Sequence, residues 1–270
     1  MPIASALRTG LIAAAALTAN LSWADPVTNW EYIATSQFIT TSGATTFSSG
    51  SGCRTITSSA ISWGQGSIGC GLGPGTGRSG IGISNNGISG TVATNGAAAP
   101  ANTYTHTNNV VSSSFATLTS ATLFSTLQLR EAGSSDPFET FSATYTILFD
   151  ETPNQTPCSI SSSPTPCNDV WVLQGSVNNS FTLGGETYFA SYFAAPALTS
   201  LPSDVCEAIA NTSLCAGFTT VEGQENAVDF MLRITNQPIT IPGEVPEPST
   251  LALLGAGLLG ALALRRRRPD

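Results

Sequence analysis

Three short segments of the chain carry carboxylates at positions where loops are expected. Asp136 and Glu139 form one pair, Asp150 and Glu151 in "FDETPN" form another, and Asp169 follows in "CNDVW". Paired carboxylates can serve as acid and base in glycoside hydrolysis, and their hard oxygens can also bind Ca²⁺. These residues are therefore the first candidates for chemistry.

The segments with Asp150, Glu151 and Asp169 flank one short loop between two cysteines, so their side chains could meet in the folded protein. Acidic loop residues are usually solvated, and we prefer that interpretation. The alternative is a calcium site, with Asp150, Glu151 and Asp169 as its candidate ligands. No other metal site is predicted.

The single histidine of the chain lies in "THTN", which contains Thr105, His106 and Asn108. A Ser-His-Asp site would use this ring as its base, but no GxSxG elbow presents a nucleophile. We interpret His106 as a polar strand or turn residue whose ring hydrogen-bonds a neighbour. No catalytic residue is predicted, although His106 and the carboxylates keep a hydrolase open as an alternative.

The segment "GTGRSG" at residues 75–80 fits the GxGxxG pattern of dinucleotide-binding proteins. That pattern needs a buried parallel strand before it and a helix after it, and neither is indicated here. These glycines are predicted to lie in a loop, and no cofactor is expected.

Six cysteines fall into three neighbouring pairs along the chain. Six cysteines allow fifteen connectivities, and short loops rich in Gly, Pro or Ser favour sequential pairing. Zinc is disfavoured because no CxxC occurs and the histidine is distant in sequence. The predicted disulfides are Cys53 with Cys70, Cys158 with Cys167 and Cys206 with Cys215.

The segment that contains these cysteines is acidic. All nine basic residues of the chain are arginines, and four of them lie together near the C-terminal end. Nucleic acid and anionic lipid need a cationic surface, so neither is expected as a partner of this segment.

The sequence pattern predicts short strands separated by turns over most of the chain. Residues 43–96 carry 15 of the 26 glycines, which predicts turns and short strands there. In residues 141–149, Phe141, Tyr145, Ile147 and Phe149 share one face, as in a half-buried antiparallel strand. Further strands are predicted in residues 30–43, 115–129, 169–175, 180–193 and 228–234. Within residues 180–193, Gly184 and Gly185 are predicted to form a tight hairpin turn.

One segment has a helical pattern, at residues 203–211, with Ser203 predicted as its N-cap and Cys215 close to its exit. The fold class predicted is therefore all-β, an antiparallel β-sandwich of jelly-roll-like form with one short helix. The order of the strands does not follow from this pattern.

The two ends of the chain differ from its body. Residues 1–24 have the pattern of a secretory signal peptide, with Arg8 before an apolar stretch and small residues before the expected cut. Residues 25–244 form the predicted secreted domain. Residues 250–264 are apolar or small, roughly 22 Å of helix against a bilayer core of about 30 Å. A transmembrane helix is predicted there, with its C-terminal end cytoplasmic because Arg265, Arg266, Arg267 and Arg268 follow.

The C-terminal segment, residues 245–270, resembles the PEP-CTERM sorting signal of Gram-negative bacteria. The motif Val245, Pro246, Glu247, Pro248 is followed by the apolar helix and the arginine cluster. The resemblance implies that an exosortase in the inner membrane recognises the tail, cleaves near the motif and releases the body toward the cell surface or exopolysaccharide matrix.

The body is similar to the THxN group of PEP-CTERM proteins, through Thr105, His106 and Asn108 and the segments "FDETPN", "PCNDVWVL" and "CAGFTTVE". This resemblance implies a fold and a cellular location but no biochemical activity. The function expected is that of a non-enzymatic surface or biofilm matrix protein that contacts exopolysaccharide, with a secreted glycan hydrolase as the alternative.

Overall fold

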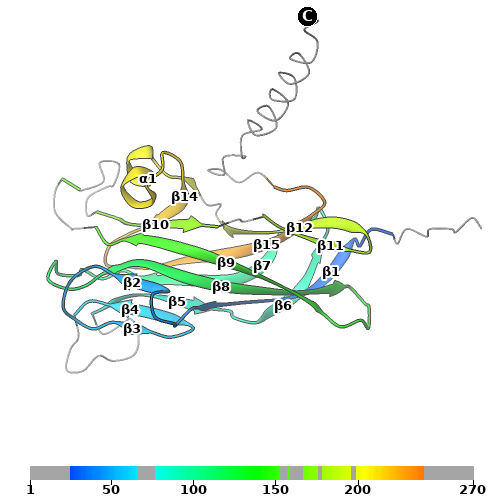
Figure 1. The fold of residues 1–270 in the computed structure, drawn as a ribbon, viewed down its shortest axis with the longest axis horizontal. Coiled ribbons are helices and arrows are strands. Elements are labelled where there is room, and N and C mark those ends of the chain that lie inside the picture. Colours follow the sequence, from blue (N-terminus) through cyan, green and yellow to red (C-terminus); the bar gives the residue numbers. More distant parts are fainter. Residues whose placement is uncertain are drawn as a thin grey trace, which may run out of the picture.

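The computed structural model confirms an all-β fold made of two curled antiparallel sheets (Figure 1). It describes residues 25–65, 77–152, 157–158, 167–175, 178–195 and 199–239. All pairs of neighbouring strands in these residues are antiparallel, and one short helix accompanies them.

The first sheet holds the long central strands of the molecule. In spatial order its strands are β13 (Thr199–Ser200), β14 (Ala216–Thr220), β10 (Asp169–Gln174), β9 (Glu139–Asp150), β8 (Leu118–Glu131), β1 (Asn29–Phe38) and β6 (Ile88–Ala93). In addition, β2 (Thr45–Phe47) pairs with β8.

The second sheet covers the inner face of the first. Its order is β11 (Asn178–Leu183), β12 (Glu186–Ala195), β15 (Glu225–Thr235), β7 (Ala99–Thr107), β5 (Ser79–Ser84), β4 (Ala60–Trp63) and β3 (Thr55–Ile56). The described residues of the glycine-rich part, 43–65 and 77–96, form short strands and turns, as the composition predicts.

In the long strands, alternation of apolar and polar residues decides which face is buried. In β9, Tyr145, Ile147 and Phe149 are buried while the residues between them are more exposed, as the pattern predicts. In β15, Leu232 and Ile234 are fully buried. The turn between β11 and β12 is formed by Gly184 and Gly185, both with positive φ, which agrees with the predicted hairpin.

The core between the sheets contains two main apolar clusters. One surrounds Trp30, Phe181 and Tyr188, whose rings meet one another at centroid distances of 5.0–5.5 Å. The other surrounds Trp63 and Trp171 and includes the buried face of β9. A third, smaller cluster packs under the helix.

The helix α1 (Ser203–Ala210) lies beside β10 and β14 at one end of the first sheet (Figure 1). The prediction that Ser203 caps it is wrong, because the helix begins at Ser203 itself. The N-cap residue is Pro202, with no side-chain cap hydrogen bond, and its carbonyl accepts from the Cys206 N–H. Asn211 ends the helix in the left-handed conformation.

Two of the predicted disulfides are confirmed. Cys206 is joined to Cys215, which fixes the exit of α1, and Cys158 is joined to Cys167 between β9 and β10. Cys53 is also disulfide-bonded, and its predicted partner Cys70 lies outside the described residues.

The predicted signal peptide and the predicted C-terminal membrane helix both lie outside the described residues. Within the described part of the chain, no helix is long and apolar enough to cross a membrane.

Candidate functional site

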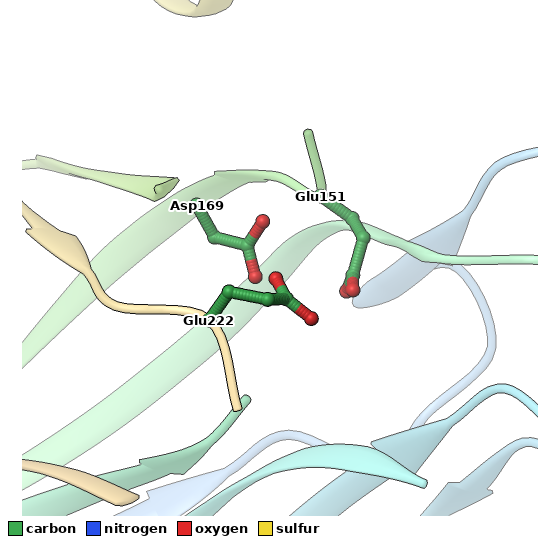
Figure 2. Close-up of side chains that lie close together, drawn as sticks. All are labelled: Glu151, Asp169 and Glu222. Atoms are coloured by element: carbon green, nitrogen blue, oxygen red, sulfur yellow. The ribbon is translucent and has the colours of Figure 1, made fainter. Parts of the chain in front are cut away.

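Three carboxylates meet at one end of the first sheet (Figure 2). Glu151 follows the last residue of β9, Asp169 is the first residue of β10, and Glu222 lies in the turn after β14. The sheet register brings them together, because Asp150 pairs with Val170 and Asp169 pairs with Thr220. We call these three residues the carboxylate cluster.

One oxygen from each of these side chains lies within 4.8 Å of the other two. The Asp169 side chain is 0% exposed, and its Oδ1 accepts from the Thr152 N–H at 2.9 Å. Glu151 Oε2 accepts from the indole N–H of Trp63 at 2.7 Å. The second oxygens, Asp169 Oδ2 and Glu151 Oε1, are buried and have no hydrogen-bond partner.

Burial and mutual repulsion make the charged forms of these groups costly. Burial, with the negative charge of Glu222 as a further cause, raises the pKa of Glu151 to about 8. Burial and then the charge of Glu151 raise the pKa of Asp169 to about 9. Such a site holds protons at neutral pH unless a cation replaces them.

The turn that carries Glu222 is fixed by side-chain hydrogen bonds. Asn226 Oδ1 accepts from the Val221 N–H at 3.0 Å, and Asn226 Nδ2 donates to the Val221 carbonyl at 3.1 Å. Gly223 has φ +71°, a conformation that glycine adopts without strain. Glu222 is therefore presented by a defined turn.

His106, on β7, is enclosed by aromatic rings near the same end of the molecule. Its ring stacks on Trp63 and meets the edges of Phe149 and Trp171 at centroid distances of 5.2–5.9 Å. Its Nδ1 lies 2.8 Å from the hydroxyl of Thr220, and its Nε2 is buried without a partner. Burial lowers the pKa of His106 to about 3, so the ring is neutral at ordinary pH.

Asn108 lies beside the turn of Glu222. The backbone N–H of Asn108 donates to the Gln224 carbonyl at 2.9 Å, and its Nδ2 donates to the Thr220 carbonyl at 3.4 Å. Thr105, the first residue of the THxN motif, pairs with Gly82 and Ala227 inside the second sheet. The motif thus joins β7 to the chain on both sides of the turn.

The sequence left Asp150, Glu151 and Asp169 as residues that could meet, with solvated loop charges as the preferred interpretation. That interpretation is wrong for Asp169, which is fully buried at the start of β10. The structure brings Glu151 and Asp169 into one cluster. Asp150 is not part of it: side chains alternate along a strand, and the residue next to Glu151 points elsewhere. Glu222 takes the third position. No local pattern singled it out, because its approach depends on the pairing of β10 with β14.

The other predicted pair, Asp136 and Glu139, lines a cavity of about 460 Å³ at a different end of the sheet. The half-buried ring of Phe141 lines the same cavity, together with the rings of Trp30 and Phe181, which are only 1% and 7% exposed. Arg130, also at its wall, forms an ion pair with Glu31 at 2.6 Å and lies over the ring of Phe138. The further acidic residues of the wall are Asp25 and Glu131.

The C-terminal motif was compared with known families. Residues 244–268 match the family model of the PEP-CTERM protein-sorting motif. Comparison with curated proteins gives no match. The family match does not reach the body, so the resemblance to the THxN group stays a prediction. The chain carries a PEP-CTERM protein-sorting motif and is therefore a substrate of exosortase-type sorting, exported and held in the membrane as a precursor.

Proposed function

We propose that the chain is a non-enzymatic protein of the cell surface or extracellular matrix of a Gram-negative bacterium, and that its body contacts exopolysaccharide. The sorting motif supports the export of the chain. The observation that carries the contact is the cavity lined by aromatic rings and carboxylates.

The lining of this cavity suits a carbohydrate. Apolar ring faces of sugars pack against aromatic side chains, and carboxylates accept hydrogen bonds from sugar hydroxyls. Asp136 and Glu139 are exposed, so the cavity opens to solvent. Arg130 is already engaged with Glu31, which leaves the wall acidic. A neutral or amino-sugar polymer therefore fits better than a polymer of uronic acids.

A non-enzymatic role agrees with the state of the candidate catalytic groups. His106 is 1% exposed and surrounded by rings, so its ring has no open route to a substrate. The raised pKa values of Glu151 and Asp169 favour a second candidate, a glycan hydrolase with a protonated acid. Asp169 is fully buried, which argues against that candidate.

A polysaccharide screen with the full chain separates these functions. Saturable binding without product supports the proposed function, and release of reducing ends would favour the hydrolase. We expect binding to a neutral glucan or to chitosan and weaker binding to alginate. An absence of both binding and product would leave a matrix protein without a specific ligand and would overturn the proposal.

Variants of exposed residues locate the contact. Glu139→Gln removes a carboxylate from the cavity wall and is expected to weaken binding about tenfold, the loss of one charge-assisted hydrogen bond. Glu207→Gln, on the exposed surface of α1, is the matched control and should bind like the parent chain. Equal affinity of both variants would place the contact elsewhere.

A further inference from the structure

The carboxylate cluster lies where two connections between strands approach each other (Figure 2). We propose that Glu151, Asp169 and Glu222 bind one calcium ion. This site is separate from the cavity assigned to polysaccharide, and the proposal does not depend on that function.

The first argument is the convergence of like charges. The three side chains come from the end of β9, the start of β10 and the turn after β14, and their oxygens approach within 4.8 Å. Three ionised carboxylates at this spacing would repel one another, and burial would strengthen the repulsion. A bound divalent cation turns that repulsion into attraction.

The second argument is the presence of buried oxygens that lack a donor. The side chain of Asp169 is fully buried, its Oδ2 has no hydrogen-bond partner, and Figure 2 shows its carboxyl group turned toward that of Glu222. Native proteins leave few such atoms without a partner unless an ion or a water completes the site.

Asn108 provides an observation of a different kind. Its side chain is 0% exposed, and its hydrogen bonds to the carbonyls of Thr220 and Gln224 hold it beside the segment that carries Glu222. Its Oδ1 is buried without a partner. Calcium sites combine neutral amide oxygens with carboxylates, and this amide is held beside the turn that carries Glu222.

The ligand chemistry selects calcium among common metal ions. Within the described residues, the group able to hold a metal consists of carboxylates alone, without the imidazole or thiolate that zinc and copper prefer. Oxygens within 4.8 Å of one another fit around an ion with metal–oxygen distances of about 2.3–2.6 Å. Magnesium binds at about 2.0–2.1 Å and gives up its waters reluctantly, which a buried site disfavours.

Terbium luminescence tests the site directly, because Tb³⁺ replaces Ca²⁺ and is excited through nearby indoles. The Trp63 indole lies against Glu151, at 2.7 Å. We expect the full chain, purified in detergent and freed of metal with EDTA, to bind one Tb³⁺ with sensitised emission that Ca²⁺ reverses. Calcium at one hundred times its Kd should also raise the Tm by about 5–10 °C.

Asp169→Asn and Glu222→Gln identify the ligands, and Glu139→Gln is the matched control at the far end of β9. The amide oxygen introduced by Asp169→Asn can still accept from the Thr152 N–H, so this variant is expected to fold and, without metal, to melt no lower than the parent. Both ligand variants should bind Tb³⁺ at least about tenfold more weakly and lose the increase in Tm. The control should keep both.

Three results would overturn the proposal. The parent chain could show no Tm change with Ca²⁺, the Asp169→Asn and Glu222→Gln variants could bind Tb³⁺ as tightly as the parent, or Mg²⁺ could stabilise the chain as much as Ca²⁺. If one variant fails to fold, the other and the parent titration still decide.

Discussion

His106 shows how strongly a polar residue can be altered by its surroundings. Three aromatic rings and the Thr220 hydroxyl enclose the imidazole, and its charged form loses water without gaining a counter-ion within hydrogen-bond distance. The ring is therefore a neutral structural group that joins β7 to β14. Because the unfolded chain binds this proton far more easily, protonation of His106 favours unfolding as the pH falls below about 6.5.

This state of His106 can be measured without assignment work, because the chain has a single histidine. We expect its imidazole resonances in an NMR titration to stay constant from neutral pH down to about pH 4, since burial lowers the pKa of the ring to about 3. Chemical denaturant in the same sample should restore a midpoint near 6.5 and serves as the control. A midpoint above about 6 in the folded protein would contradict the enclosed ring.

Glu151 and Asp169 give a pH effect of opposite sign. Folding raises their pKa values from about 4 in the unfolded chain to about 8 and about 9. Between about pH 4 and about pH 9, the folded state therefore binds more protons than the unfolded state. The free energy of unfolding then falls as the pH rises through this window. In EDTA, we expect the Tm to decrease from about pH 7 to about pH 9, a range above the titration of unfolded histidine.

The variant Asp169→Asn checks the origin of that decrease. It removes one of the two titrating groups, so its Tm should depend less on pH than that of the parent chain over the same range. Glu207→Gln leaves the cluster intact and should follow the parent. Identical pH profiles for the parent and for Asp169→Asn would assign the effect to other groups.

At the scale of elements, the contact between β10 and β14 decides where the carboxylates meet. Gly217 on β14 pairs with Val172 on β10, and a Cβ added at Gly217 would lie only 1.9 Å from the Trp171 carbonyl oxygen. The close approach of these two backbones therefore requires glycine.

Gly217→Ala should consequently destabilise the protein by about 3 kcal/mol, because backbone atoms of β10 must move to admit the methyl group. Gly82→Ala, in β5, is the matched control, since a Cβ there meets no atom within 4 Å and φ is not positive. We expect the control to stay within about 0.5 kcal/mol of the parent. Denaturant unfolding measures both, and equal stability of the two variants would contradict the close approach.

The elements also show what a sequence can reveal. The alternation of β9, the glycine turn before β12 and the two disulfide loops closed by Cys158–Cys167 and Cys206–Cys215 are local features, and each is confirmed by the structure. The start of α1 depends on where the preceding turn ends, and Ser203 falls inside the first helical turn. Glu222 joins Glu151 and Asp169 only through pairing between distant strands, which carries no local signal.

At the scale of the whole molecule, β9 separates two regions of different chemistry. Glu139 at its first residue lines the cavity, and Asp150 at its last residue precedes the carboxylate cluster, roughly 35 Å away along an extended strand. A ligand in the cavity and an ion in the cluster would therefore act independently, because their charges are screened over that distance. The Glu139→Gln variant can serve as a metal-binding control for this reason.

The sorting motif is the part of the chain on which exosortase-type processing acts. Residues 244–268 match the motif, and the Pro246, Glu247 and Pro248 side chains form its most distinctive part. We expect replacement of all three by Ala to leave the full-length precursor in the membrane of cells that contain the exosortase, because the processing enzyme loses its recognition sequence.

Immunoblots of membrane and surface fractions with an antibody to the body measure this outcome. Pro242→Ala is the matched control, since it removes a proline just outside the matched residues and should leave processing unchanged. The apolar segment and arginines are intact in both variants, so membrane insertion itself should be equal. Release of the triple variant to the surface at the parental level would mean that the Pro-Glu-Pro sequence does not direct processing, and that recognition depends on the apolar segment and the arginine cluster.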